Sequence, residues 1–235
     1  MEKNFPFTFF GNKLLEKSIS PVMYTTRKRR NNTMTLLNAV VYIHNWGDKS
    51  DLVKVLKHNS HVSSLFHIMG RYSYLLDVNF DNKDQFEKWI DHIKNLKLSS
   101  GVPSVISVET QKIIEVIKKK DDFNLGDYKK TGEKSHFFLT IDNPHHDKNL
   151  ISLLQGSDIT HTLLHVQGSS SYITEIIAEN YNEYKALLME LKNLTSIFHI
   201  ETQEVISVIK YRNKILDESG NLVSPGEDTR ELYSL

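Results

Sequence analysis

Two glycine turns carry the side chains with the clearest capacity for ligand chemistry in this chain of 235 residues. Gly70 is followed by Arg71, Tyr72 and Ser73, and Gly168 is followed by three serines. The three serines are Ser169, Ser170 and Ser171. Hydroxyl groups, a guanidinium group and free backbone N–H groups at such turns can hold a small polar ligand. The alternative is a pair of hairpin turns with ordinary turn serines. We take both turns as candidate ligand-binding sites.

The tripeptide Glu-Thr-Gln occurs twice, at 109–111 and 201–203, each time inside an apolar run typical of a strand. Side chains alternate between the two faces of a strand, so Thr110 and Thr202 point away from their Glu and Gln neighbours. We add these two threonines to the candidate ligand-binding residues. The alternative is a structural recurrence in which the Glu and Gln row faces solvent or a partner.

A basic run, Arg27-Lys28-Arg29-Arg30, is the densest positive patch of the chain and precedes Asn31, Asn32 and Thr33. Such groups contact phosphates in protein–DNA complexes, so the run is a candidate DNA-binding arm. The alternative is a solvated linker, because Lys+Arg and Asp+Glu balance at 29 each and the whole chain carries no positive field.

No catalytic residue, metal site or cofactor is indicated. The chain has no cysteine, and its one tight histidine pair, His145-His146, consists of adjacent residues that rarely chelate one ion. Sequence motifs of a nucleophile elbow, a phosphate loop or a zinc protease are missing. The N-terminal sequence lacks the pattern of a signal peptide, and no apolar run is long enough to span a membrane. We therefore expect a cytoplasmic protein that is not an enzyme.

An internal repeat organises most of the sequence. "LFHIMGRYSYLLDV" (65–78) matches "LLHVQGSSSYITEI" (163–176), and "SVETQKIIEVIKKK" (107–120) matches "HIETQEVISVIKYR" (199–212). The matches share Leu, His, Gly, Ser and Tyr in the first pair and Glu-Thr-Gln in the second, in the same order. Duplication is the simplest explanation of ordered self-similarity.

Each repeat shows the same succession of periodicities: strand, short helix, two strands, longer helix, strand. This order predicts an α+β fold of two tandem ferredoxin-like (βαββαβ) repeats. Their sheets would pair face to face or edge to edge as an intramolecular pseudo-dimer. The expected boundaries are an N-terminal arm (1–35), a first repeat (36–120), a linker (121–134), a second repeat (135–212) and a C-terminal extension (213–235).

This order, with Gly70 to Leu76, Gly101-Val102 and Thr110 in the first repeat, resembles the effector-binding domain of Lrp/AsnC-type (feast/famine) transcriptional regulators. Gly168 to Tyr172 and Thr202 match in the second repeat. The resemblance covers residues 36–118 and 136–210. It implies a non-enzymatic sensor that forms oligomers, binds an amino acid or related metabolite beside the glycine turn, and acts in transcription regulation through DNA.

The sequence departs from that family in two places. The acidic residue usual after Gly-x-Tyr is replaced by Ser73 and Ser171, which removes the partner of an α-ammonium group. About 35 residues precede the first strand, too few for a complete helix-turn-helix module. Residues 11–36 are thus a remnant of a winged helix-turn-helix, the end of a truncated module or an unrelated arm.

Two other functions remain open. One is a stand-alone sensor that acts on a partner protein without binding DNA. The other is a dimeric α+β barrel-type enzyme or haem-binding protein, because duplicated ferredoxin-like units also resemble that class. His67 or His165, which are equivalent in the repeat, would then be the candidate haem ligand.

Overall fold

The computed structural model describes residues 36–46, 50–97, 101–120, 134–217 and 220–223. Contacts divide the chain into residues 1–33 and 34–235, and every described residue belongs to the second unit. The expected N-terminal arm up to residue 35, with its basic run at 27–30, and nearly all of the expected linker lie outside the described residues.

Both repeats follow the predicted strand and helix order, and the α+β fold of two ferredoxin-like repeats is confirmed. The elements of the first repeat are β1 (Leu37–Asn45), α1 (Ser50–His58), β2 (Val62–Met69), β3 (Tyr74–Phe80), α2 (Lys83–Lys94) and β4 (Val105–Lys119). The elements of the second repeat are β5 (Ser135–Asp142), α3 (Lys148–Gly156), β6 (Thr160–Gln167), β7 (Tyr172–Ala178), α4 (Tyr181–Lys192) and β8 (His199–Tyr211), followed by β9 (Lys214–Ile215).

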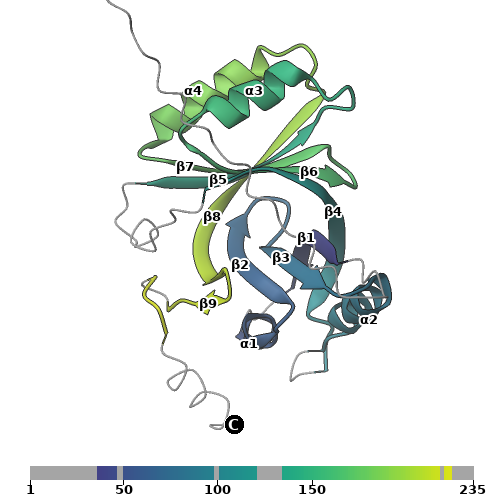
Figure 1. The fold of residues 1–235 in the computed structure, drawn as a ribbon. Coiled ribbons are helices and arrows are strands. Elements are labelled where there is room, and N and C mark those ends of the chain that lie inside the picture. The colour runs from purple at the N-terminus through teal and green to yellow at the C-terminus, as the bar shows by residue number, and fades with distance from the viewer. Residues whose placement is uncertain (1–35, 47–49, 98–100, 121–133, 218–219, 224–235) are drawn as a thin grey trace, which may run out of the picture. The chain divides into compact units, whose positions relative to one another are not determined.

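The two four-stranded sheets join into one closed sheet through their last strands, which are unusually long. The order is β2-β3-β1-β4-β6-β7-β5-β8, with β2 pairing with β8 to close it and β9 added to β8. One half of β4 pairs with β1 of its own repeat and the other half with β6 of the second repeat. Likewise, β8 pairs with β5 and then with β2. Figure 1 shows β4 and β8 running from the strands of one repeat to those of the other.

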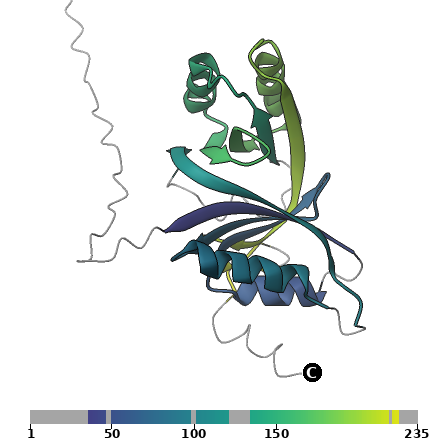
Figure 2. The same ribbon diagram turned by 90° about the vertical axis from the view of Figure 1, so that its right-hand side faces the viewer.

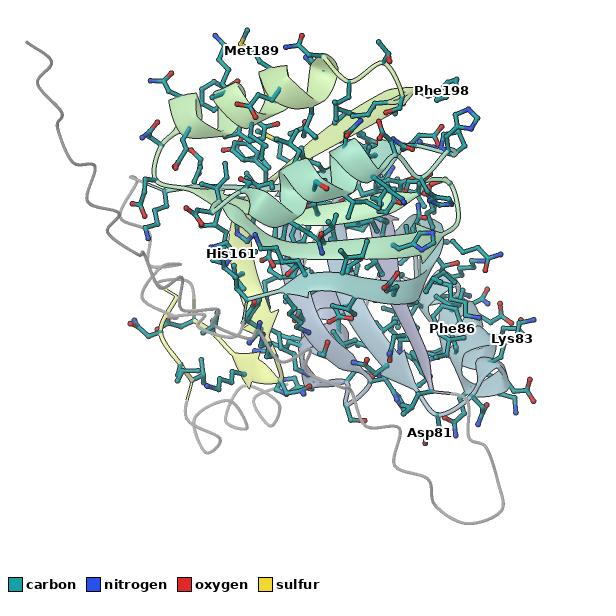
Figure 3. The ribbon with its side chains drawn as sticks, turned by 45° about the horizontal axis from the view of Figure 1, so that its top comes forward. Asp81, Lys83, Phe86, His161, Met189 and Phe198 are labelled. Carbon is teal, nitrogen blue, oxygen red and sulfur yellow. The ribbon has the colours of Figure 1, made fainter. Side chains whose placement is uncertain are left out.

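Apolar side chains fill three layers around this closed sheet. Val41 and Ile43 point toward α1 and α2, whereas Val40 and Tyr42 on the same strand point toward the opposite repeat. An equivalent core lies beneath α3 and α4. The two pairs of helices therefore cover opposite outer faces (Figure 2), while Met189 on the outer side of α4 points to solvent (Figure 3). Strands buried on both faces explain the continuous apolar runs in the sequence.

Repeat-related asparagines begin the longer helices. The Asn82 side chain accepts a hydrogen bond from the Gln85 N–H (2.9 Å), and the Asn180 side chain accepts from the Asn182 and Glu183 N–H groups (3.0 and 3.1 Å). These N-caps satisfy donors that the helix itself leaves unpaired. They fix the same helix start in both repeats.

Repeat-related lysines cap carbonyl groups of the opposite repeat. Lys118 donates to the carbonyl oxygens of Gln155 and Ser157 at the end of α3 (2.8 and 2.7 Å). Lys210 donates to the carbonyl oxygen of Asn59, just after α1 (2.9 Å). A cation at a helix C-terminus is favourable because the last carbonyl groups carry partial negative charge. Each capping bond therefore ties one repeat to the other.

Each glycine turn packs against the other repeat, and the two contacts are equivalent. A Cβ atom on Gly70 would lie 3.3 Å from Gln203 Cγ, and one on Gly168 would lie 2.3 Å from Gln111 Oε1. Gln111 and Gln203 are buried, at 0% and 1% exposure. Each glycine thus lets a hairpin of one repeat approach a buried glutamine of the other.

None of the described helices is both long and apolar enough to cross a membrane.

We predict that Gly168→Ala destabilises the fold by about 1–3 kcal/mol, because the new methyl group would displace the buried Gln111 side chain. Gly156→Ala is the matched control, since a Cβ at that helix end meets nothing within 4 Å. Urea unfolding of both variants measures the difference. Equal stability of the two variants would contradict the close hairpin contact.

Candidate functional site

A polar cavity of about 120 Å³ lies where the two glycine turns meet the two Glu-Thr-Gln strands. Residues of both repeats line it, so the cavity lies at the interface between the two repeats. Its lining residues are Tyr42, Arg71, Tyr72, Glu109, Thr140, Asp142, Ser169, Ser170, His199, Glu201 and Gln203.

One half of the cavity is closed by hydrogen bonds around Glu109. The Tyr72 and Ser169 hydroxyl groups donate to its carboxylate, and Gln111 Nε2 donates to it at 3.0 Å. Gln111 Nε2 also donates to Ser169 Oγ at 2.6 Å, and its Oε1 accepts from the Ser170 hydroxyl at 3.3 Å. The second hairpin thereby saturates the polar groups of Glu109 and Gln111.

This network sets the protonation states. Burial acts to raise the pKa of Glu109, but the hydrogen bonds from Ser169 and Tyr72 outweigh it and hold this pKa below 4.5. Burial, followed by the hydrogen bond to Glu109, raises the pKa of the Tyr72 hydroxyl above its ordinary value. Burial also raises the pKa of the Tyr42 hydroxyl. At neutral pH the site holds an ionised carboxylate beside protonated tyrosines.

The other half of the cavity has polar groups that hydrogen bonds within the protein do not saturate. Among the described residues, Gln203 Oε1 is a buried atom without a hydrogen-bond partner, and the buried hydroxyls of Tyr42 and Thr140 interact with each other but have no other partner. All three side chains line the cavity. Buried polar groups in proteins are nearly always paired with protein, water or ligand. This half therefore presents the groups with unused bonding capacity.

Strand register explains which side chains face the cavity. Tyr42 is paired with Glu109 across β1 and β4, and Thr140 is paired with Glu201 across β5 and β8. Residues two apart on one strand share a face, which brings Gln203 into the same wall. The two Glu-Thr-Gln strands thus present equivalent Glu and Gln side chains from opposite repeats.

Part of the residue set expected to bind a ligand reaches the cavity. Arg71, Tyr72, Ser169 and Ser170 line it. Arg71 also stacks its guanidinium over Tyr72, at 5.3 Å from the ring centroid. Gly70 and Gly168 pack against the buried glutamines rather than offering open space.

The remaining members of that set make structural contacts. The Ser73 and Ser171 hydroxyls accept hydrogen bonds from the Asn45 and Asn143 N–H groups (3.4 and 3.0 Å), at the ends of β1 and β5. Thr110 is exposed, and the Thr202 hydroxyl lies 2.9 Å from the Tyr184 hydroxyl beneath α4.

The Glu109, Glu201 and Gln203 side chains line the cavity, and the two threonines do not. Seven lining residues lie outside the predicted ligand-binding set: Tyr42, Glu109, Thr140, Asp142, His199, Glu201 and Gln203. Tyr42 and Thr140 are related by the repeat offset of 98, which was a usable signal.

The repeat-related histidines lie outside the cavity. His67 lies 5.5 Å from Tyr74, and His165 lies 5.4 Å from Tyr172, between ring centroids. His146 adds a hydrogen bond from its Nδ1 position to the Tyr172 hydroxyl (2.9 Å) and an edge contact with His165. No group of three metal-ligating side chains occurs within the described ranges.

Comparison with known proteins identifies the fold and no family. No family model matches the sequence, and no curated protein matches it. A structure titled as the siroheme decarboxylase NirDL is similar, with a TM-score of 0.54 and 6% identity over 76% of this chain and 74% of that one. The structure of NirDL in co-complex with an iron-uroporphyrin III analogue has a TM-score of 0.52 and 6% identity, and the match covers 85% of this chain and 78% of that one. A structure of chlorite dismutase from Candidatus Nitrospira defluvii has a TM-score of 0.45 and 8% identity, and the match covers 85% of this chain and 96% of that one.

These comparisons contradict several expectations from the sequence. The similar structures with TM-scores above 0.5 are those of an enzyme, a siroheme decarboxylase, and not of an Lrp/AsnC regulator. The interpretation as a non-enzymatic transcription regulator that binds DNA is therefore wrong. The physical reason is that both classes share the βαββαβ order, so this order does not distinguish a regulator from a barrel enzyme.

The described residues do not fit a tetrapyrrole. The cavity of about 120 Å³ is smaller than the roughly 300–1,000 Å³ typical of pockets for drug-sized ligands. The layers between helices and sheet are filled by buried side chains such as Leu52, Leu56, Leu150 and Leu154. His67 and His165 do not line this cavity, and each lies against a tyrosine ring.

We predict that Glu109→Gln lowers the free energy of unfolding by about 1 kcal/mol at pH 7, a modest loss because the site is partly exposed. The pKa of Glu109 is lower in the folded state, so its contribution is present above its ordinary pKa and is lost as the pH falls through the folded value. The deficit of the variant should thus shrink below pH 4.5.

Urea unfolding of wild type, Glu109→Gln and the exposed control Glu190→Gln, at pH 7 and at about pH 3, makes this measurement. A deficit that stays constant with pH would show that the Glu109 carboxylate is not held ionised by its neighbours.

Proposed function

We propose that this chain is an α+β barrel-type enzyme that binds a small polar substrate in the cavity between the repeats. The observation that carries the proposal is the buried, unpartnered Gln203 Oε1 in the wall of the shared cavity, beside the buried Tyr42 and Thr140 hydroxyls. An unpaired buried polar group costs roughly 1–3 kcal/mol. A hydrogen-bonding ligand would remove that cost.

The two halves of the cavity have different roles in this proposal: one supports the site and the other reacts with the substrate. Glu109, saturated by three side chains, holds Tyr72 and the second hairpin in place. Glu201 lies in the open half, and its carboxylate makes no hydrogen bond among the described residues, so it is the candidate acid–base group. Tyr42, kept protonated by burial, can donate a hydrogen bond to a developing negative charge, whereas the Tyr72 hydroxyl already donates to Glu109.

The enzymatic class of this proposal rests on the fold comparison. The neighbours with TM-scores of 0.54 and 0.52 are structures of an enzyme, a siroheme decarboxylase. Their identity of 6% transfers the fold and not the substrate. The substrate class is argued from this cavity instead. Assembly of the chain into a homo-oligomer remains a prediction.

A thermal-shift screen of small polar metabolites tests the proposal. Some compounds should raise the melting temperature of wild type and of the exposed control Gln85→Leu, but not of Gln203→Leu, which removes the unpaired amide from the cavity wall. A compound found in this way should be consumed by wild type and not by Glu201→Gln.

Hemin serves as the comparison compound in the same assay and should give no saturable Soret shift. The proposal fails if every stabilising compound acts equally on Gln203→Leu, or if hemin binds one-to-one and the binding is lost in His165→Ala.

A further inference from the structure

We propose that the ligand of this cavity is a small organic cation whose N–H groups face a wall formed by β5 and β8. This inference rests on the proposed function and adds the charge and orientation of the ligand. It follows from three features: the wall, its unpaired acceptors, and the difference between the two halves of the cavity.

The wall comes from two neighbouring antiparallel strands. Thr140 and Asp142 are alternate residues of β5, and their cross-strand partners on β8 are Glu201 and His199. Gln203 continues the row on β8 and has 1% of its surface exposed. All five side chains line the cavity, so this face of the sheet is a single polar surface.

Hydrogen-bond acceptors predominate on this surface. Glu201 and Asp142 bring two carboxylates that make no side-chain hydrogen bond among the described residues, and Gln203 Oε1 is buried and unpaired. Thr140, 8% exposed, adds a hydroxyl oxygen whose partner is the Tyr42 hydroxyl. A ligand that satisfies them must supply N–H or O–H donors, and charge favours N–H groups of a cation. An anionic ligand would meet like charge from both carboxylates.

Arg71 does not reverse this balance. Its guanidinium group lies over the Tyr72 ring and helps to lower the pKa of Glu109. Three carboxylates line the cavity, those of Glu109, Glu201 and Asp142, and the one guanidinium offsets only one of these charges.

The two halves differ because equivalent positions have diverged. Arg71 and Tyr72 of the first hairpin correspond to Ser169 and Ser170 of the second, and Tyr42 corresponds to Thr140. The small second hairpin fits onto Gln111 and saturates it, whereas Gln203 keeps an unpaired oxygen. The structure thus offers one open half per chain, and the expected stoichiometry is one ligand per chain.

Isothermal titration calorimetry with three probes of equal chain length tests the inference on the full chain. Putrescine supplies two ammonium groups, 1,4-butanediol is its neutral analogue, and succinate is an anion. We expect putrescine to bind once per chain, butanediol to bind at least tenfold more weakly, and succinate not to bind.

A matched pair of substitutions on β8 assigns the binding to the wall. Glu201→Gln should weaken putrescine binding at least tenfold, because it removes the charge while keeping the shape. Glu204→Gln, an exposed position on the same strand, should leave the affinity unchanged. Circular dichroism confirms that both variants are folded.

The outcomes separate the two proposals. Equal binding of butanediol and putrescine, or putrescine binding that Glu201→Gln leaves intact, overturns the cationic ligand while the cavity remains a site. No binding of any of the three probes also overturns it, and the Gln203→Leu screen then decides the proposed function by itself.

Discussion

The reciprocal exchange between repeats is the constraint on which the rest of the structure depends. Each long final strand pairs first within its own repeat and then with the other, so neither sheet has a free edge at that side. Each glycine hairpin rests on a buried glutamine of the opposite repeat. The polar groups of Gln111 and Gln203 therefore need hydrogen-bond partners from the opposite repeat or from a ligand. This requirement places a polar cavity inside an otherwise apolar interface.

Gene duplication would produce two equal halves of this cavity, and divergence has made them different. Hydroxyls from the second hairpin saturate Gln111 and Glu109, and the first hairpin carries the bulkier Arg71 and Tyr72 in place of small serines. The closed half is therefore a rigid support, and the open half keeps unpaired groups. Preorganised groups of this kind bind ligands without first breaking their own hydrogen bonds.

The fold was predictable from the sequence because the repeat doubled every local signal. Apolar periodicity at 84–97 predicts a helix, and the structure has α2 there, capped by Asn82 as α4 is capped by Asn180. The cavity was only half predictable. Arg71 and Tyr72 stand beside an obvious glycine, but Asp142 and His199 reach the site through strand register, and no local pattern encodes the pairing between repeats. The function was misjudged because a shared βαββαβ order does not distinguish regulators from barrel enzymes.

The measurement that tests the cavity most directly is an NMR comparison of the side-chain amide signals of Gln111 and Gln203, assigned with Gln111→Leu and Gln203→Leu, before and after addition of a stabilising compound. We expect the Gln203 signals to shift strongly, because that amide faces the ligand. The Gln111 signals should hardly move, because the second hairpin already saturates this amide. A strong shift of Gln111 with an unchanged Gln203 would contradict the division into an open and a closed half.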